Sequence, residues 1–130
     1  MNTNFHRVAV VGAGAMGQGI AQMCAQAGAG VWVHDVAPGA AEKACQAILL
    51  QWQKLQDKGR LTAADTAQLQ ERLHPATSLR DLADCDLVIE AVVENMAIKT
   101  GLFAELENLL SPQAVIATNT SSLSVTALAA

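Results

Sequence analysis

The sequence of 130 residues lacks the features that mark membrane and nucleic-acid-binding proteins. No apolar run reaches the roughly 18 residues of a membrane span, and residues 1–7 lack the apolar region of a signal peptide. Basic residues are few, eight against twelve acidic ones, and they form no stripe that would favour nucleic acid as a partner. We therefore expect a single cytoplasmic domain with no membrane and no nucleic-acid partner.

Cysteine is also scarce, with Cys24, Cys45 and Cys85 far apart in the chain. An odd number without a C-x-x-C pair does not suit a disulfide framework and indicates reduced thiols. No histidine lies near them at a spacing typical of metal ligands. The sequence therefore predicts no metal site and no catalytic cysteine.

The residues that are present alternate between short apolar runs and helical patterns, with 52% hydrophobic and 15% charged residues. Strands are expected at Arg7–Val11, Val31–His34, Ala76–Ser78, Leu87–Val92 and Ala114–Thr118. Helices are expected at Ala15–Ala27, Ala40–Lys58, Thr62–Leu73 and Ile98–Leu110, with another starting at Leu123–Ala130 and a turn or short helix at Leu79–Ala83. This rhythm predicts an α/β fold, a doubly wound parallel sheet of order 3-2-1-4-5 with helices on both faces and a helical insertion after the second strand.

A glycine-rich turn, Gly12-Ala13-Gly14-Ala15-Met16-Gly17, follows the first expected strand. Its spacing occurs often by chance, but here it joins a strand to a helix, and the next strand ends beside Asp35. Gly12 would permit the tight exit from the strand, Gly14 a close approach to a pyrophosphate, and Gly17 tight helix packing. The helix N-terminus favours phosphates. We therefore predict a dinucleotide site here, the alternative being a tight turn that binds nothing.

Asp35 comes 18 residues after Gly17, at the expected end of the second strand. A carboxylate there can accept hydrogen bonds from both hydroxyls of an adenosine ribose. It would also repel a 2′-phosphate, by about 4 kcal/mol for each charge pair at about 4 Å. No Arg or Lys follows in residues 36–41 to offset that repulsion. The predicted cofactor is therefore NAD rather than NADP.

More polar side chains follow the fourth and fifth strands, whose carboxyl ends share an edge with the glycine turn. Glu94 lies beyond the fourth strand, and together with Asn95 and Lys99 it could hold the nicotinamide-side ribose. A helix-start carboxylate that pairs with a lysine is the alternative. Glu90 lies within the strand, so a packed, hydrogen-bonded carboxylate is expected there. The Asn119–Ser122 stretch either contacts a ribose or substrate oxygen or caps the next helix.

Hydride transfer from an alcohol also needs a base that takes the hydroxyl proton. His6 precedes the first strand, at the opposite edge of the sheet. His34 adjoins Asp35, and His74 leads into the third strand, so both lie on the adenosine side. The chain thus contains a cofactor site but no evident proton acceptor.

These segments together resemble the NAD-binding domain of the 3-hydroxyacyl-CoA dehydrogenase family, which includes 3-hydroxybutyryl-CoA and phenylacetate-pathway members. The resemblance covers the chain nearly end to end and rests on three motifs in the same order. These are the run from Val8 to Ala21, the segment Leu87–Asn95 with Lys99, and Asn119–Ser124. The resemblance implies an oxidoreductase of fatty acid metabolism that uses NAD to oxidise (S)-3-hydroxyacyl-CoA to 3-ketoacyl-CoA.

The resemblance also implies roles for individual residues. The glycine turn (Gly12, Ala13, Gly14, Ala15, Met16 and Gly17), Asp35, Glu94 and Lys99 would bind NAD. Ser121 would touch cofactor and substrate, which makes it the candidate catalytic residue, with Asn119 a candidate substrate contact. The helix after the second strand lies near the CoA moiety in the family. Lys54 or Lys58 could correspond there, and we take Lys58 as the candidate, although Gln51 stands where some members have Ser.

The family's catalytic histidine, its partner glutamate and a helical dimerisation domain would all follow residue 130. We therefore expect residues 1–130 to be an NAD-binding domain separated from a homodimeric acyl-CoA enzyme, with little or no turnover of its own. One alternative is the 3-hydroxyisobutyrate dehydrogenase group, which shares the Gly-x-Gly-x-Met-Gly turn. The Asn119–Ser122 stretch and the helical insertion at residues 40–73 argue against it. Another alternative is a non-catalytic NAD-binding or redox-sensing module.

Overall fold

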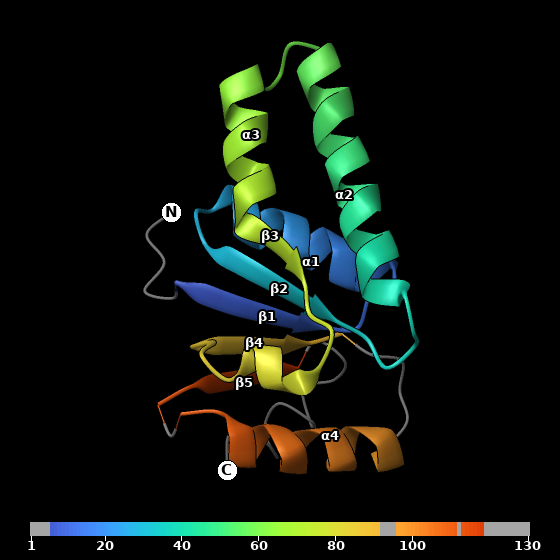
Figure 1. The fold of residues 1–130 in the computed structure, drawn as a ribbon, viewed down its shortest axis with the longest axis vertical. Coiled ribbons are helices and arrows are strands. Elements are labelled where there is room, and N and C mark those ends of the chain that lie inside the picture. The colour runs from blue at the N-terminus through green and yellow to red at the C-terminus, as the bar shows by residue number, and fades with distance from the viewer. Residues whose placement is uncertain (1–5, 92–95, 112, 119–130) are drawn as a thin grey trace.

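The computed structural model of the protein describes residues 6–91, 96–111 and 113–118. The strands are β1 (Arg7–Val11), β2 (Gly30–His34), β3 (Leu73–Pro75), β4 (Leu87–Glu90) and β5 (Val115–Thr118). The helices are α1 (Ala15–Gln26), α2 (Ala40–Asp57), α3 (Ala63–Arg72) and α4 (Met96–Leu109), with a 3₁₀ helix, η1 (Leu79–Leu82). Figure 1 shows the sheet between these helices. None of the helices in these ranges is long and apolar enough to cross a membrane.

All five strands are parallel and lie in the order β3-β2-β1-β4-β5, which confirms the predicted topology. The central strand β1 ends at Val11, which is in register with His34 on one side and Glu90 on the other. The carboxyl ends of β2, β1 and β4 therefore form one edge. Chain order reverses there between β1 and β4, and such a point is where open α/β sheets bind ligands.

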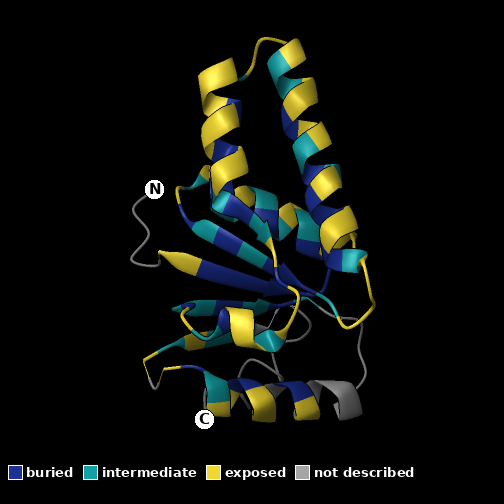
Figure 2. Ribbon diagram, in the orientation of Figure 1, coloured by how far each residue is buried: buried dark blue, intermediate teal, exposed yellow. Residues whose placement is uncertain are grey.

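Side chains from β1 alternate between two separate apolar cores, one on each face of the sheet. Val10 packs with residues of α1, α2 and α3. Ala9 and Val11 pack with residues of η1 and α4. Figure 2 shows the buried residues along the strands and on the inner sides of the helices. The prediction of helices on both faces is thus confirmed.

The helical insertion forms a hairpin of α2 and α3 that projects beyond the sheet (Figure 1). The predicted apolar stripe of α2 packs into the first core, with Ala44, Ile48 and Trp52 buried. The predicted capping box opens α3, because Thr62 and Asp65 accept hydrogen bonds from each other's backbone N–H, at 3.0 and 3.1 Å. The insertion is therefore anchored at its base by burial, and the start of its second helix is capped.

The third strand lies three residues earlier than the predicted Ala76–Ser78, so that prediction was wrong. The backbone becomes extended at Leu73, directly after α3, and the Leu73 side chain is buried, with 7% of its surface exposed. Pro75 lacks an N–H but is tolerated because β3 is an edge strand. Ala76 still donates its N–H to the Val33 carbonyl, at 2.7 Å, beyond the end of the strand. The end of the predicted fourth strand at Val92 and the predicted start of a helix at Leu123–Ala130 fall outside the described residues.

Candidate functional site

The glycine turn leaves the carboxyl end of β1 and leads directly into α1. Gly12 has a φ of 115°, which L side chains rarely adopt. Its N–H donates to the carbonyl of His34 at 2.8 Å, so the turn continues the contact between β1 and β2. Glycine is needed at this position because the chain must reverse direction immediately after the strand.

Gly17 and Gly14 are required for opposite reasons. A Cβ on Gly17 would lie 1.8 Å from the carbonyl oxygen of Gly12, so α1 can pack this close only without a side chain. A Cβ on Gly14 would meet no atom within 4 Å. The space beside Gly14 therefore suits a group that must approach the backbone, as the pyrophosphate of a dinucleotide does.

The N-terminus of α1 begins at this open space. Gly14 is the N-cap residue, and because glycine has no side chain it forms no side-chain cap hydrogen bond with the helix. The first backbone bond of the helix runs from the N–H of Gln18 to the carbonyl of Gly14, at 2.9 Å. The helix dipole, with its positive end at the N-terminus, favours an anion at such a position.

Asp35 lies directly after β2, and its carboxylate is held against the glycine turn. One oxygen, Oδ2, accepts from the N–H of Ala13 at 2.7 Å, and the other, Oδ1, accepts from the N–H of Ala37 at 2.9 Å. A carboxylate has about four acceptor sites, so two remain for ribose hydroxyls. The carboxylate is thus oriented by the backbone on two sides before any ligand arrives.

The loop that follows β2 contains no lysine or arginine near Asp35 in the sequence. Val36 is 73% exposed, and the first basic residue after it is Lys43, in the first half of α2. A 2′-phosphate beside Asp35 would face a carboxylate with no Arg or Lys from residues 36–42 to pair with it. The Asp35 carboxylate and the lack of a nearby cation in this loop therefore fit NAD better than NADP.

The other predicted contacts of the cofactor or substrate are not assembled in the described residues. Glu94, Asn119 and Ser121 lie outside them. Lys99 belongs to the first turns of α4, but its side chain is not described. Lys58 is exposed at the C-terminal cap of α2, at the opposite end of that helix from the loop after Asp35. The structure therefore describes the adenosine half of the predicted site.

Glu90 and His34 are buried at the same edge, one on each side of Val11. Glu90 is fully buried, as expected for a packed carboxylate in a strand. His34 is 8% exposed, and its Nδ1 has no hydrogen-bond partner in the described part of the chain. Burial lowers the pKa of His34, although the carboxylates of Asp35, Asp81 and Glu105 partly oppose this effect. His34 is therefore a buried neutral imidazole rather than an exposed one.

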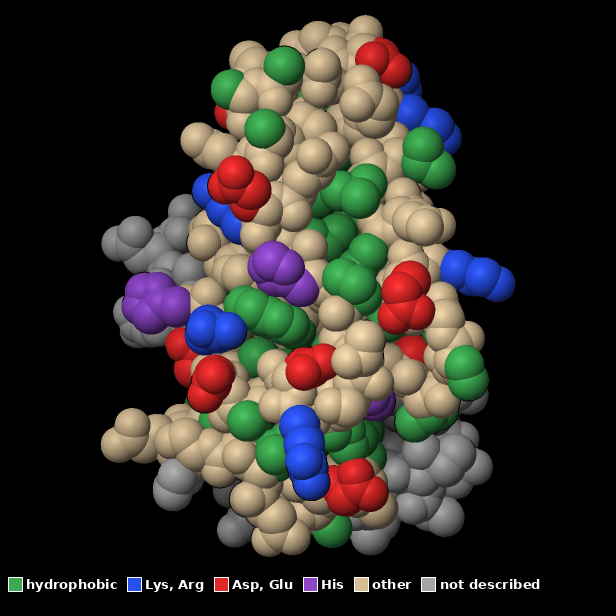
Figure 3. Space-filling model, in the orientation of Figure 1, with side chains coloured by type: hydrophobic (Ala, Val, Ile, Leu, Met, Phe, Trp, Pro, Cys, Tyr) green, Lys and Arg blue, Asp and Glu red, His purple; other side chains and the backbone are tan. Residues whose placement is uncertain are grey.

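The remaining histidines lie away from the turn. The N–H of His6 donates to the carboxylate of Asp86, before β1 begins. His74 stacks on Trp32, with ring centroids 4.8 Å apart, and the Arg7 guanidinium lies 4.4 Å from the centre of the same indole. Figure 3 shows histidine, hydrophobic and basic side chains together over β1, β2 and β3. Neither histidine contacts the glycine turn in the described part of the chain.

The three cysteines are free thiols, in agreement with the sequence-based expectation. Burial raises the pKa of Cys45 and of Cys85 to about 11, and it also raises the pKa of Cys24. Protonated thiols are poor nucleophiles and poor metal ligands at neutral pH. In the described ranges, no group of three or more His, Cys, Asp or Glu residues could hold a metal ion.

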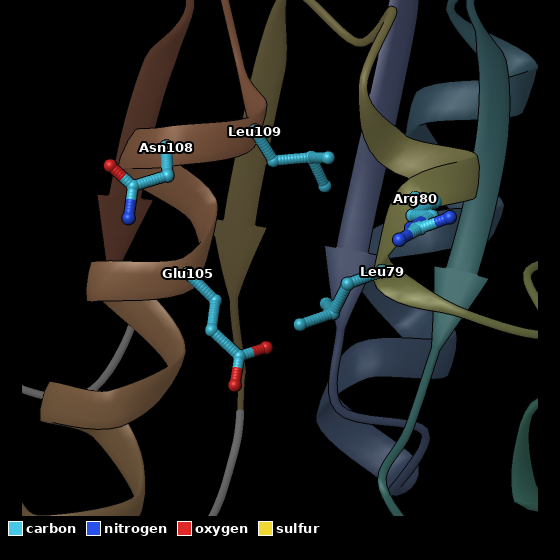
Figure 4. Close-up of a pocket in the computed structure, with 5 residues that line it drawn as sticks. All are labelled: Leu79, Arg80, Glu105, Asn108 and Leu109. Atoms are coloured by element: carbon cyan, nitrogen blue, oxygen red, sulfur yellow. The ribbon is translucent and has the colours of Figure 1, made fainter.

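Two surface depressions lie away from the glycine turn. The first, of about 300 Å³, separates η1 from α4, with Leu79 and Glu105 pointing toward each other across it (Figure 4). Arg80, Asn108 and Leu109 complete its lining. The second, of about 270 Å³, is lined by Gln26, Leu61, Asp65, Gln68, Leu69 and Arg72. Neither contains a residue of the turn or Asp35, so neither belongs to the candidate site.

Sequence reasoning missed one residue that contacts the glycine turn, Gln18 in α1. Its Nε2 donates to the carbonyl of Ala13 at 3.1 Å. The only sequence signal was an amide side chain in the first turn of the helix that follows a glycine-rich loop. Such a side chain is more often simply solvated, so the contact became evident only from the structure.

Comparison with known proteins agrees with this geometry. Residues 7–130 match the family model described as "3-hydroxyacyl-CoA dehydrogenase, NAD binding domain". A probable 3-hydroxybutyryl-CoA dehydrogenase of Deinococcus radiodurans is 48% identical over 120 residues, which are 92% of this chain and 43% of that protein. A 3-hydroxyadipyl-CoA dehydrogenase of Escherichia coli is 41% identical over 130 residues, 100% of this chain and 27% of that protein.

Solved structures give the same result. The (S)-3-hydroxybutyryl-CoA dehydrogenase of Ralstonia eutropha superposes with a TM-score of 0.87 at 38% identity, covering 97% of this chain and 44% of that one. This chain thus spans less than half the length of each of these relatives. The family match and the identities show that the chain belongs to the NAD-binding domains of the 3-hydroxyacyl-CoA dehydrogenase family.

Proposed function

We propose that this chain binds NAD(H) across the edge formed by the glycine turn and the end of β2. The pyrophosphate lies against Gly14 and the N-terminus of α1, and the adenosine ribose donates its hydroxyls to Asp35. The observation that carries the proposal is the Asp35 carboxylate, held 2.7 Å from the N–H of Ala13 and therefore next to the open space at Gly14. A charged acceptor in this place fits the ribose of NAD and repels the 2′-phosphate of NADP.

Within a longer protein, residues 1–130 would serve as the NAD-binding domain of an enzyme that interconverts (S)-3-hydroxyacyl-CoA and 3-ketoacyl-CoA. The names of the relatives support this substrate class, since they act on 3-hydroxybutyryl-CoA and 3-hydroxyadipyl-CoA. We assign the nicotinamide-side ribose to Glu94 and Lys99, and the acyl-CoA to Lys58, Asn119 and Ser121. We further propose a cytoplasmic enzyme that forms a homodimer through a domain after residue 130.

Bound NAD would supply the chemistry of hydride transfer, and the chain's own residues would bind and orient it. A base must also take the proton of the substrate hydroxyl. His34 is buried on the adenosine side, and His6 and His74 lie away from the turn, so none of the three histidines fits that task. The resemblance assigns the base to a segment after residue 130. We therefore propose that residues 1–130 alone hold the cofactor without completing the reaction.

The proposal is tested by titrating the protein with NADH and following binding by calorimetry. We expect NADH to bind more tightly than NADPH, and Asp35→Ala to raise the Kd for NADH at least several-fold, since charge-assisted bonds to the ribose are lost. Asp84→Ala is a matched control, because it removes an exposed carboxylate that lies elsewhere. Equal NADH affinity in wild type and Asp35→Ala would refute the ribose assignment.

Catalysis is tested with the same 130 residues, acetoacetyl-CoA and NADH. We expect no reduction above the buffer rate, measured by the absorbance of NADH. Clear turnover would show that a proton donor and acceptor exists within these residues, against the proposal.

A further inference from the structure

Ala13 is held by side chains on both of its backbone polar groups. Asp35 accepts its N–H at 2.7 Å, and Gln18 donates from Nε2 to its carbonyl oxygen at 3.1 Å. Ala13 is 8% exposed, and Gln18 is half-buried in the first turn of α1. The middle of the glycine turn is therefore clamped between α1 and the end of β2.

The two bonds orient two successive peptide units. A trans peptide unit is planar, so its C=O and N–H point in opposite directions. Asp35 holds the unit between Gly12 and Ala13 by its N–H. Gln18 holds the unit between Ala13 and Gly14 by its carbonyl. With that carbonyl bonded to Gln18, the N–H of Gly14 points away from Gln18.

This second unit has little else to hold it. Gly14 has no Cβ, so on the Gly14 side the rotation of the unit meets no side chain, and a Cβ there would touch nothing. Within the described residues, the N–H of Gly14 has no hydrogen-bond partner. A rotated unit would present the Ala13 carbonyl, with its partial negative charge, where the N–H had been. Such a change would turn a donor for phosphate into a group that repels it.

We propose that Gln18 is a positioning residue for the pyrophosphate: by binding the Ala13 carbonyl, it keeps the N–H of Gly14 facing the ligand. Gln18 does not itself touch the cofactor. The inference rests on the proposed function, since it assumes that the pyrophosphate lies against Gly14. It adds a side chain outside the glycine motif to the residues that determine affinity.

The test compares Gln18→Ala with Gln22→Ala in binding to NADH and to adenosine, which lacks the pyrophosphate. Gln22 is half-buried one turn later on α1, and its side chain forms no hydrogen bond within the described residues. We expect Gln18→Ala to raise the Kd for NADH about fivefold, as the loss of one neutral hydrogen bond would. The Kd for adenosine, followed by NMR chemical shifts, stays unchanged, and Gln22→Ala changes neither.

A second variant, Gln18→Glu, separates positioning from a general loss of structure. At pH 7.5 its carboxylate faces the Ala13 carbonyl without a proton to donate, so NADH binding falls more than in Gln18→Ala. At pH 5 a protonated carboxyl can donate, so the Kd ratio of Gln18→Glu to wild type becomes smaller. General damage to the fold would not be repaired by acid.

The outcomes separate the two claims. Wild-type protein that does not bind NADH would overturn the proposed function, and the inference with it. If the wild type binds NADH and Gln18→Ala binds it with the same Kd, the inference alone is overturned. An equal loss of adenosine binding in Gln18→Ala would also overturn it, because that loss would show a defect outside the pyrophosphate contact.

Discussion

The two faces of the sheet bury different kinds of side chain. On the face covered by α1, α2 and α3, the buried side chains in the described part of the chain are hydrophobic apart from Thr66, whose hydroxyl donates to the carbonyl of the N-cap residue Thr62 at 3.2 Å. On the face covered by η1 and α4, the last register positions of β2 and β4 bury His34 and Glu90. The first face is held together by the packing of hydrophobic side chains, whereas the second face also buries ionisable groups at the carboxyl ends of its strands.

The difference reflects what each face must do. The first face has to bring α1 close to β1, so that the helix N-terminus meets the glycine turn, and this needs small or well-packed apolar groups. The second face places His34 and Glu90 at the carboxyl ends of their strands, which is the edge where open α/β sheets bind ligands. Ionisable groups at that edge can gain or lose a proton as the pH changes. Substitutions on the first face should therefore act mainly through packing, and one on the second face through protonation.

Trp52→Ala should have the largest effect on stability. Trp52 is fully buried on the first face, so truncation should lower the free energy of unfolding by about 3–5 kcal/mol. Its Nε1 has no hydrogen-bond partner within the described residues. Trp52→Phe should therefore cost less, roughly 1–2 kcal/mol, because it removes that unsatisfied donor and keeps an aromatic ring. Urea unfolding measures both, and a loss below about 1 kcal/mol for Trp52→Ala would contradict packing as the main term.

Gly17→Ala should have the next largest effect, because its Cβ would lie 1.8 Å from the Gly12 carbonyl oxygen. Forced separation of α1 from β1 should cost about 1–3 kcal/mol and abolish measurable NADH binding. Gly14→Ala is the matched control for packing, since its Cβ meets nothing and its φ of −72° is open to alanine. Alanine is a poorer N-cap than glycine, but it also lowers the conformational entropy of the unfolded chain, and these two effects oppose each other. The variant should keep wild-type stability in thermal unfolding yet weaken NADH binding. Equal destabilisation by both variants would refute the distinction between the two glycines.

His34→Gln should have the smallest effect, visible only as a change in pH dependence. Burial lowers the pKa of His34 in the folded protein below its ordinary 6.5. As pH falls below 6.5, the unfolded chain takes up the proton first, so stability declines until the folded pKa is passed. His34→Gln cannot take up this proton, so its free energy of unfolding should depend less on pH between 7 and 5. Identical slopes in urea titrations of the two proteins would show that His34 does not contribute.

Local signals in the sequence were sufficient for the elements around the turn. A β-branched run, glycines at fixed spacing and the carboxylate at Asp35 predicted β1, α1 and the end of β2, because each signal acts within a few residues. The third strand was misplaced because tertiary pairing with β2 selected Leu73–Pro75, although the proline argues locally against a strand. Local propensity cannot anticipate an edge strand that tolerates a proline.

The sequence by itself determined the order of elements, the positions of Gly12, Gly14 and Gly17, and the charge beside the predicted ribose. These follow from periodicity and from the few conformations that glycine alone adopts easily. Only the tertiary structure decided that Asp35 and Gln18 hold the two polar groups of Ala13. The physical reason is that Asp35 lies 22 residues from Ala13 and reaches it only once the sheet has formed. Gln18 lies five residues from Ala13 and reaches its carbonyl only through the particular geometry of the glycine turn and the start of α1.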